Sequence, residues 1–255
     1  MSLDRCHNIE RLRAKAKRRL PAPIFHYLDG GADDEVTLRR NTDAFNDYEL
    51  VPNLLRDTSN IDTKTKALGV ELDWPVFLSP TGMSKLFHHT GERAAARAAH
   101  KAGTLYSLST MATTTIEDVA AETPGPKMFQ IYVYKDRGLT KEFIARCKAA
   151  KYDAICVTID VPVPGNRERD LVTGMTMPPT FSLASLFSFA THPVWSLNAL
   201  RNPSFDLVNM SQHESLSLKD KQISPVQYLA SQIDSGMTWK DAEWMAQEWG
   251  GRFLI

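Results

Sequence analysis

The sequence has only three cysteines among 255 residues, Cys6, Cys147 and Cys156, and they are widely spaced. It contains no Cys-x-x-Cys pair, so it suggests neither a zinc site nor a disulfide framework, and a reducing cytoplasm fits best. We expect no metal site. The neighbouring His88 and His89 have no carboxylate partners at the spacing that metal ligands require.

An excess of charge of either sign is also missing. Thirty basic and thirty acidic residues give a formal net charge of zero, whereas nucleic-acid-binding proteins normally carry a basic excess, so no nucleic-acid partner is expected. The N-terminus lacks the apolar segment of a signal peptide. No uninterrupted apolar run is long enough to cross a membrane.

From residue 75 onward, short apolar runs alternate with helical patterns. The predicted strands cover 75–80, 104–110, 127–134, 153–162 and 252–255, and the predicted helices cover 90–103, 115–122, 139–151 and 238–251. This alternation predicts parallel strands joined by right-handed crossovers and buried on both faces. About five strands suit an open doubly wound sheet, whereas a (β/α)8 barrel needs three more units. Periodicity alone leaves both open.

Polar residues gather where the predicted strands end. They are Pro80, Thr81, Gly82, Ser109, Thr110, Gln130, Tyr132, Thr158 and Asp160, with Arg167 just beyond. Active sites of parallel α/β folds lie at this edge. Hydroxyls and a Gln amide can hydrogen-bond a heteroaromatic ring, and Tyr and Arg can hold a carboxylate. The pattern predicts a carboxylate-bearing substrate against a planar cofactor, although the sequence has neither the Rossmann nor the P-loop fingerprint.

Six collinear segments carry a family resemblance: FHYLDGGADDEVTLRRN, LSPTGM, LSTMATTTIEDVA, FQIYVYKDRG, VTIDVPVPGNRERD and TWKD. They resemble the FMN-dependent L-2-hydroxy-acid dehydrogenase and oxidase family. FHYLDGGA and THPVW are most similar to its bacterial L-lactate dehydrogenase branch. The resemblance implies a TIM (β/α)8 barrel, here incomplete with about strands 1–5. Residues 1–74 would form an N-terminal helical cap, and 75–255 a partial FMN-binding barrel with an insertion, or lid, at 163–236.

The implied reaction is the FMN-dependent oxidation of a lactate-like L-2-hydroxy acid to the 2-oxo acid. Electrons would pass to a quinone, a cytochrome or O2, and the family is often oligomeric, so a homo-oligomer is expected. The residues that match the cofactor-binding positions of the family are Pro80, Thr81 and Gly82 beside the isoalloxazine, and Ser109, Gln130 and Thr158 on the flavin ring.

The resemblance also assigns residues to the substrate. Tyr27 matches the tyrosine that binds the substrate carboxylate, and Tyr132 matches the one that contacts the substrate hydroxyl and helps stabilise the transition state. Asp160 matches the carboxylate paired with the catalytic histidine, and Arg167 matches an arginine near flavin and substrate. Met111 stands where some members carry a bulky aromatic, which disfavours glycolate and leaves lactate, mandelate or a longer hydroxy acid open.

Two elements of the family pattern are missing. In the family, a lysine follows the fifth strand and an SNHGGRQLD-type block with the catalytic base follows the sixth, but this sequence stops at Ile255 and contains no HGGR. We therefore expect an incomplete chain whose first and fifth strands are open edges. The alternative function is a catalytically silent fragment that binds flavin or pairs with a partner.

Residues 177–208 form the most apolar part of the insertion. One interpretation is a lid packed on the barrel, and the other is a peripheral contact with the membrane that holds the electron acceptor. Pro179, His192 and Pro193 interrupt the run, so it can lie on a bilayer but does not span one. The expected location is the cytoplasm, with contact to the inner membrane as the alternative.

Overall fold

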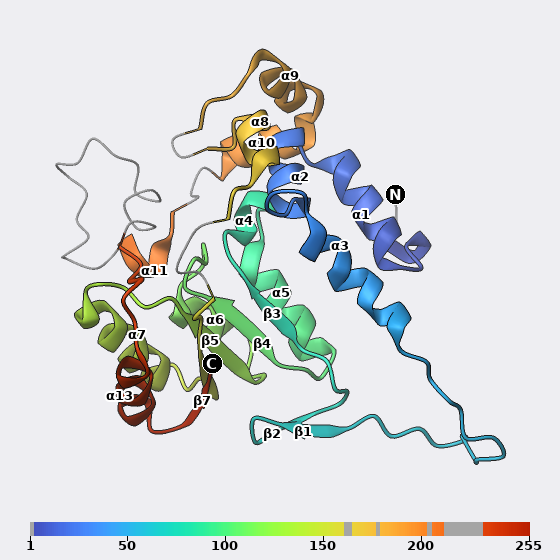
Figure 1. The fold of residues 1–255 in the computed structure, drawn as a ribbon, viewed down its shortest axis with the longest axis vertical. Coiled ribbons are helices and arrows are strands. Elements are labelled where there is room, and N and C mark those ends of the chain that lie inside the picture. Colours follow the sequence, from blue (N-terminus) through green and yellow to red (C-terminus); the bar gives the residue numbers. More distant parts are fainter. Residues whose placement is uncertain (1–2, 161–164, 177–178, 203–205, 212–231) are drawn as a thin grey trace. The chain divides into compact units, whose positions relative to one another are not determined.

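The computed structural model describes residues 3–160, 165–176, 179–202, 206–211 and 232–255 (Figure 1). The chain divides into two compact units. The first, here called the helical unit, comprises Met1–Ile61 and Pro164–Pro203. The second, the sheet unit, comprises Asp62–Val163 and Ser204–Ile255. The predicted division into a cap at 1–74 and a partial barrel at 75–255 stays a prediction.

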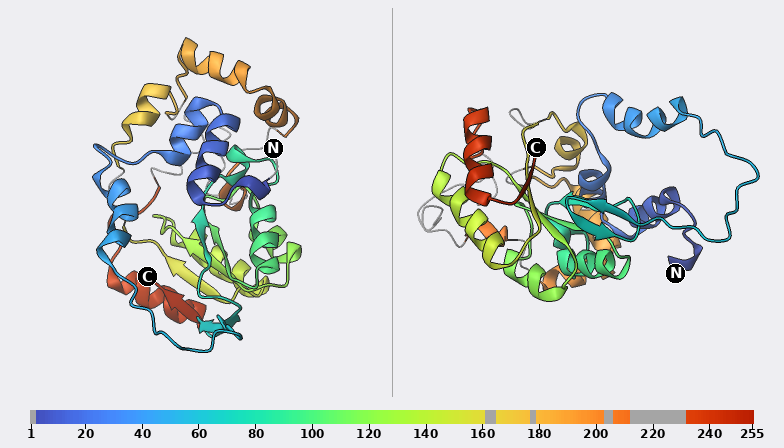
Figure 2. Two further views of the ribbon diagram at one scale, coloured as in Figure 1. Left: turned by 90° about the vertical axis from the view of Figure 1, so that its right-hand side faces the viewer. Right: turned by 90° about the horizontal axis from the view of Figure 1, so that it is seen from below.

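The sheet unit is built on five parallel strands in the order β3-β4-β5-β6-β7. Their bounds are Leu78–Thr81, Tyr106–Ser109, Lys127–Ile131, Ala154–Val157 and Arg252–Leu254. The helices between them are α4 (Ser84–Phe87), α5 (Gly91–Lys101), α6 (Ile116–Glu122), α7 (Arg137–Ala149) and α13 (Trp239–Trp249). Figures 1 and 2 show α5, α6, α7 and α13 following one another along one side of the sheet. The predicted alternation of strands and helices is confirmed.

The structure corrects the ends of two predicted strands. The strand predicted over 153–162 ends as β6 at Val157. We predicted a strand over 127–134, but β5 ends at Ile131. The chain beyond it pairs with another segment: Tyr134 forms an antiparallel bridge with Ile233, and Asp234 N donates to Val133 O at 2.8 Å. The apolar pattern continues through Tyr134 because that side chain is buried, so the sequence did not mark the change of partner. Residues 161–162 of the strand predicted over 153–162 lie outside the described residues.

Helix boundaries follow local capping chemistry. Thr238 and Asp241 form a capping box at the start of α13, with each side chain bonded to the other's backbone. The Thr115 side chain accepts from Asp118 N at 3.0 Å at the start of α6. Helix α7 begins two residues before its predicted start because Asp136 caps it by accepting from Gly138 N at 2.8 Å.

An apolar cluster occupies the N-terminal ends of the strands. The hairpin of β1 (Thr65–Ala67) and β2 (Val70–Leu72) brings Leu72 against Leu105, Met128 and Ala154, and all four side chains are buried. On the helix side of the sheet, Phe129 makes edge-to-face contacts with aromatic side chains of α7 and the following turn. The two central strands β4 and β5 are buried along their whole length.

Strands β3 and β7 form the edges of this sheet. Leu78 of β3 is 39% exposed and Ile255, directly after β7, is 52% exposed. The predicted edge positions of these two strands are therefore confirmed within the described residues. Such edges present unpaired backbone groups and apolar side chains to any strand that can align with them.

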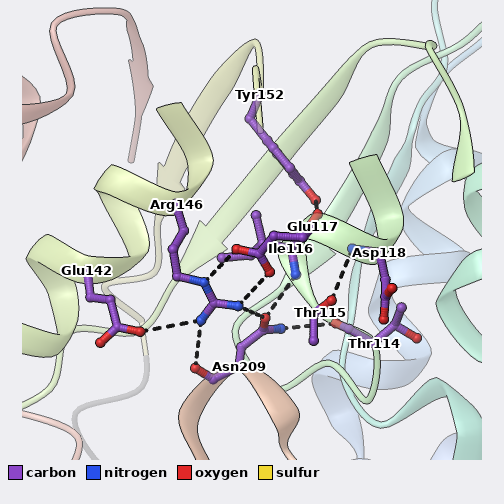
Figure 3. Close-up of polar contacts among 9 residues, drawn as sticks. All are labelled: Thr114, Thr115, Ile116, Glu117, Asp118, Glu142, Arg146, Tyr152 and Asn209. Carbon is purple, nitrogen blue, oxygen red and sulfur yellow. Dashed lines mark hydrogen bonds and ion pairs between the residues drawn. The ribbon is translucent and has the colours of Figure 1, made fainter. Parts of the chain in front are cut away.

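A short helix, α11 (Val208–Ser211), is attached to the sheet unit by a buried polar network (Figure 3). Asn209 is fully buried; its amide donates to Thr114 O at 3.0 Å and its Oδ1 accepts from Ile116 N at 2.9 Å. Arg146 donates to both Asn209 carbonyl groups at 3.1 Å and makes two 2.8 Å bonds to Glu117. The asparagine thereby supplies an acceptor for a backbone amide at the N-terminus of α6, which has no partner within the helix.

The helical unit contains α1 (Ile9–Arg19), α2 (Ala22–Asp29), α3 (Val36–Asp43), α8 (Glu168–Thr173), α9 (Leu183–Thr191) and α10 (Pro193–Arg201), with short 3-10 turns at Leu3–Arg5 and Ala44–Asp47. Asp29 at the end of α2 pairs with Arg13 and, at 3.1 Å, with Arg169 of α8. In the described part of the chain, no helix is long and apolar enough to cross a bilayer.

Candidate functional site

A ladder of polar side chains joins three strands at their C-terminal ends. Ser109 Oγ donates to Gln130 Oε1 at 3.0 Å, and Gln130 Nε2 donates to Thr158 Oγ1 at 2.6 Å. Ser109 and Gln130 lie opposite each other in the parallel register of β4 and β5, so their side chains share a face of the sheet. The structure thus brings together three residues that the sequence had only aligned by strand position.

The loops after β3 and β4 are fastened to each other. Met83 N donates to Met111 O at 2.8 Å. A Cβ on Gly82 would lie 3.0 Å from the Met111 Cβ, so this approach favours glycine. Pro80 is half-buried and Thr81 is exposed. Pro80 and Thr81 are the last residues of β3, and Gly82, which follows them, lies beside the loop that follows Ser109.

A cavity of about 350 Å³ opens beside the ladder. Its wall includes Tyr132, Thr158, Ile233, Thr238, Trp239 and Ile255. Burial raises the pKa of the half-buried Tyr132 phenol, and the charge of Asp160 raises it further. The phenol consequently stays protonated at neutral pH and can donate a hydrogen bond. Asp160 itself is exposed.

An ion-pair cluster, here called the Arg137 clamp, holds one wall of this cavity. The Arg137 guanidinium contacts Asp234 at 2.6 Å and Asp241 at 2.8 Å and 3.0 Å. Bonds from backbone amides and from Arg137 lower the pKa of both carboxyl groups. The clamp joins the start of α7 to the segment that runs from Ile233 into α13, so it sets where that wall lies.

Tyr27 and Arg167 belong to the helical unit, whereas the other predicted site residues belong to the sheet unit. The Arg167 guanidinium lies over the Tyr27 ring, 5.2 Å from its centroid. The same side chain donates to Gly30 O at 3.0 Å and to Asp170 at 2.5 Å. The structure therefore pairs these two predicted residues with each other.

Sequence reasoning missed two charged residues at this edge. Glu92 is completely buried within an alanine-rich helix, and Arg137 forms the clamp described above. Glu92 lies in none of the six segments that carry the family resemblance, and FQIYVYKDRG, which contains Arg137, assigned that residue no role. A charged residue on a helix is normally solvated. Among the described residues, no group of three or more His, Cys, Asp or Glu side chains is arranged to hold a metal ion.

Known proteins match this chain in sequence and fold. The model of the FMN-dependent dehydrogenase family matches residues 16–255. An L-lactate dehydrogenase of Vibrio parahaemolyticus is 39% identical over 246 residues, covering 95% of this chain and 64% of that protein. A putative L-lactate dehydrogenase of Mycobacterium tuberculosis is 38% identical over 248 residues, covering 97% of this chain and 58% of that protein.

Among solved structures, a monotopic membrane protein, (S)-mandelate dehydrogenase, superposes with a TM-score of 0.89 at 31% identity, covering 97% of this chain and 65% of that chain. A putative lactate oxidase of Pediococcus acidilactici gives 0.75 at 25% identity, with 97% and 58% covered. The chain thus spans less than two thirds of the length of these relatives. The predicted α/β fold, parallel strands of a TIM barrel with N-terminal helices, is confirmed for the part that the chain spans.

Proposed function

Because the chain belongs to the FMN-dependent dehydrogenase family, we propose that it forms part of the site that oxidises an L-2-hydroxy acid to the 2-oxo acid. L-lactate is the proposed substrate, since the relatives from Vibrio and Mycobacterium carry the name L-lactate dehydrogenase. The electron acceptor would be a quinone, a cytochrome or O2. A homo-oligomer is the proposed assembly, and no nucleic-acid partner is proposed.

The observation that carries this proposal is the Ser109–Gln130–Thr158 ladder. Its bonds leave one amide proton of Gln130 and the hydroxyl proton of Thr158 without a partner among the described residues. Two donors at the C-terminal edge of a parallel sheet suit the carbonyl and nitrogen acceptors of a flavin ring. FMN, when bound, supplies the acceptor for the two electrons that leave the hydroxy acid. Pro80 and Thr81 at the end of β3, and Gly82 directly after it, would support the ring from the neighbouring strand end.

Four further residues would act on the substrate. The protonated Tyr132 phenol would donate to the substrate hydroxyl oxygen and stabilise charge that develops there. Tyr27 and Arg167 would bind the carboxylate, because a guanidinium and a phenol both donate to its oxygens. Asp160, an exposed carboxylate beside Tyr132, would orient an imidazole base and stabilise its charged form.

The experiment that tests the proposal is titration of the 255-residue chain with FMN, followed by visible absorbance and flavin fluorescence. We expect bound flavin, and Gln130→Leu is expected to weaken binding by about tenfold because it removes the central donor of the ladder. Anaerobic addition of L-lactate should then bleach the flavin, with D-lactate as the matched control. A chain that binds no FMN, or bound FMN that no L-2-hydroxy acid reduces, contradicts the corresponding part of the proposal.

A second candidate is a polypeptide that binds flavin or pairs with another chain but turns over no substrate. The observation that favours it is that the chain spans only 64% and 58% of the length of the Vibrio and Mycobacterium relatives. General base catalysis contributes roughly a factor of 10²–10⁴, so loss of the base would make flavin reduction very slow. Bound FMN that stays oxidised with L-lactate and L-mandelate would favour this candidate over the first.

We further propose that α9 and α10 contact a membrane surface. Their side chains Leu183, Phe187, Val194 and Leu200 are each at least 69% exposed, and the similar (S)-mandelate dehydrogenase is described as monotopic. Flotation with phospholipid vesicles tests this: Phe187→Glu with Leu200→Glu should abolish co-flotation. If the double variant floats as well as the unaltered chain, these helices are better interpreted as a lid.

A further inference from the structure

Glu92 is a buried acidic residue for which the proposed chemistry has no use. It lies in the first turn of α5, and its side chain is completely shielded from solvent. A buried carboxylate is strongly unfavourable unless it is hydrogen-bonded or paired. Its neighbours must therefore explain why it is there.

Four donors from two separate loops converge on this carboxylate. From the start of α4, which the loop after β3 leads into, Ser84 N donates to Oε1 at 3.1 Å. From the loop after β4, Thr113 N donates to Oε1 at 2.9 Å, the Thr113 hydroxyl lies 2.8 Å from Oε2, and the Thr114 hydroxyl donates to Oε2 at 2.7 Å. Thr113 Oγ1 also accepts from Lys85 N at 3.2 Å, which ties the two loops together a second time.

The position of Glu92 suits a fixed anion. The N-terminal turn of a helix stabilises negative charge through its dipole. Burial raises the pKa of the nearby Tyr106 phenol, and the charge of Glu92 raises it further. Both sides of the carboxylate are filled with donors, so the side chain has one arrangement that satisfies all of its partners.

The first of these loops begins at Gly82, directly after Pro80 and Thr81 at the end of β3, and the second follows Ser109 at the end of β4. We propose that Glu92 is a positioning residue: it holds the two loops at a fixed separation and so places these four residues for a flavin ring. The flavin part rests on the proposed function. The role depends on where the two acceptor oxygens lie and not on their charge.

That distinction gives opposite expectations for two substitutions. Glu92→Gln keeps the length of the side chain: its Oε1 can accept from both backbone amides, and its amide can donate to the Thr114 hydroxyl, which accepts equally well. Glu92→Asp keeps the charge but withdraws the carboxylate by about 1.5 Å, one carbon–carbon bond. We therefore expect Glu92→Gln to retain the loop arrangement and Glu92→Asp to lose it.

Amide hydrogen exchange, followed residue by residue by NMR, measures the loops directly. In Glu92→Asp, exchange at Ser84 and Thr113 should accelerate by about tenfold relative to Phe129 in β5, as expected when a buried donor loses its acceptor. Glu92→Gln should leave these rates within about twofold. The matched controls are Glu122→Asp and Glu122→Gln, which alter a carboxylate of α6 that pairs with Arg97 of α5. They should leave the exchange rates at Ser84 and Thr113 unchanged.

FMN affinity provides the second measurement. Glu92→Asp should weaken binding by about tenfold, and Glu92→Gln by no more than about twofold. If Glu92→Asp does not fold, Thr113→Val takes its place, because it removes the hydroxyl between Glu92 and Lys85 and should accelerate exchange at Lys85. The inference is overturned if exchange at these amides stays unchanged in Glu92→Asp or in Thr113→Val. It is also overturned if Glu92→Gln accelerates exchange and weakens FMN binding while Glu92→Asp does neither. If the unaltered chain binds no FMN, the proposed function fails for this chain, and exchange still decides the role of Glu92.

Discussion

The two ends of the parallel sheet are built on different principles. At the N-terminal ends of the strands, Leu72, Leu105, Met128 and Ala154 form a cluster without polar side chains. At the C-terminal ends, Ser109, Gln130 and Thr158 bond one another in a line. The apolar end gains its stability from removing surface from water. The polar end is stable only where each donor meets an acceptor, and this requirement makes it a precise scaffold for a ligand.

Ser107 marks the boundary between the two ends. It pairs with Met128 in the register of β4 and β5, and its buried hydroxyl is among the few buried polar atoms without a partner in the described residues. A buried hydroxyl without a partner is unfavourable by roughly 1–3 kcal/mol. The sheet thus tolerates one unsatisfied group where the apolar end passes into the polar end.

The largest expected effect breaks the apolar end. Leu105→Ala should lower the free energy of unfolding by about 2–5 kcal/mol, because Leu105 is fully buried and its truncation leaves a cavity. Urea denaturation followed by circular dichroism measures the change. FMN affinity below the transition should stay unchanged. Equal losses of stability and affinity would mean that the two ends are coupled.

A smaller effect is expected at the polar end from Asn209→Ala. It leaves the amide of Ile116 without its acceptor and removes the side-chain bonds with Arg146 and with Thr114 O, which should cost about 2–3 kcal/mol. Asn209→Asp is the matched variant, because it keeps the acceptor for Ile116 and replaces only the donor to Thr114 O with an acceptor. Urea denaturation should rank the unaltered chain, Asn209→Asp and Asn209→Ala in decreasing stability.

The Arg137 clamp should make stability depend on pH. Folding lowers the pKa of Asp234 and Asp241, so their contribution is present above the ordinary carboxyl pKa near 4 and is lost as the pH falls through the folded value. Arg137→Gln should cost about 1 kcal/mol at pH 7, since the cluster is partly exposed. Thermal unfolding between pH 7 and pH 3 should show a shallower decline in the variant. Parallel curves would contradict this assignment.

The smallest effect is expected where charges meet solvent. Arg97→Gln removes the ion pair with Glu122, but the arginine side chain is about half exposed. Such pairs contribute roughly 0.2–1 kcal/mol, and salt screens them. Denaturation midpoints with and without added salt should differ little between the variant and the unaltered chain. If Arg97→Gln lowered the free energy of unfolding as much as Asn209→Ala, burial would not explain the difference between the exposed ion pair and the buried Asn209 network.

Much of the sheet unit was predictable because its signals are local. Five apolar runs, the helices between them and the Thr238–Asp241 capping box each depend on residues close together in the chain, and the structure confirms them. The antiparallel bridge between Tyr134 and Ile233 was not predictable, because the two residues are about a hundred positions apart in the chain. Neither segment has a sequence pattern that indicates its pairing partner. The roles predicted for Tyr27, Tyr132, Asp160 and Arg167 stay predictions.

By itself, the sequence determined the family, the order of strands and helices, and which polar residues end each strand, since periodicity, capping and collinear motifs are read along the chain. Only the tertiary structure decided that Gln130 bonds both Ser109 and Thr158, that Arg137 clamps the wall of the cavity, and that Glu92 is buried beneath two loops. These contacts join residues from different elements, and hydrogen bonds that depend on separation and angle form only once the strands and helices have been packed.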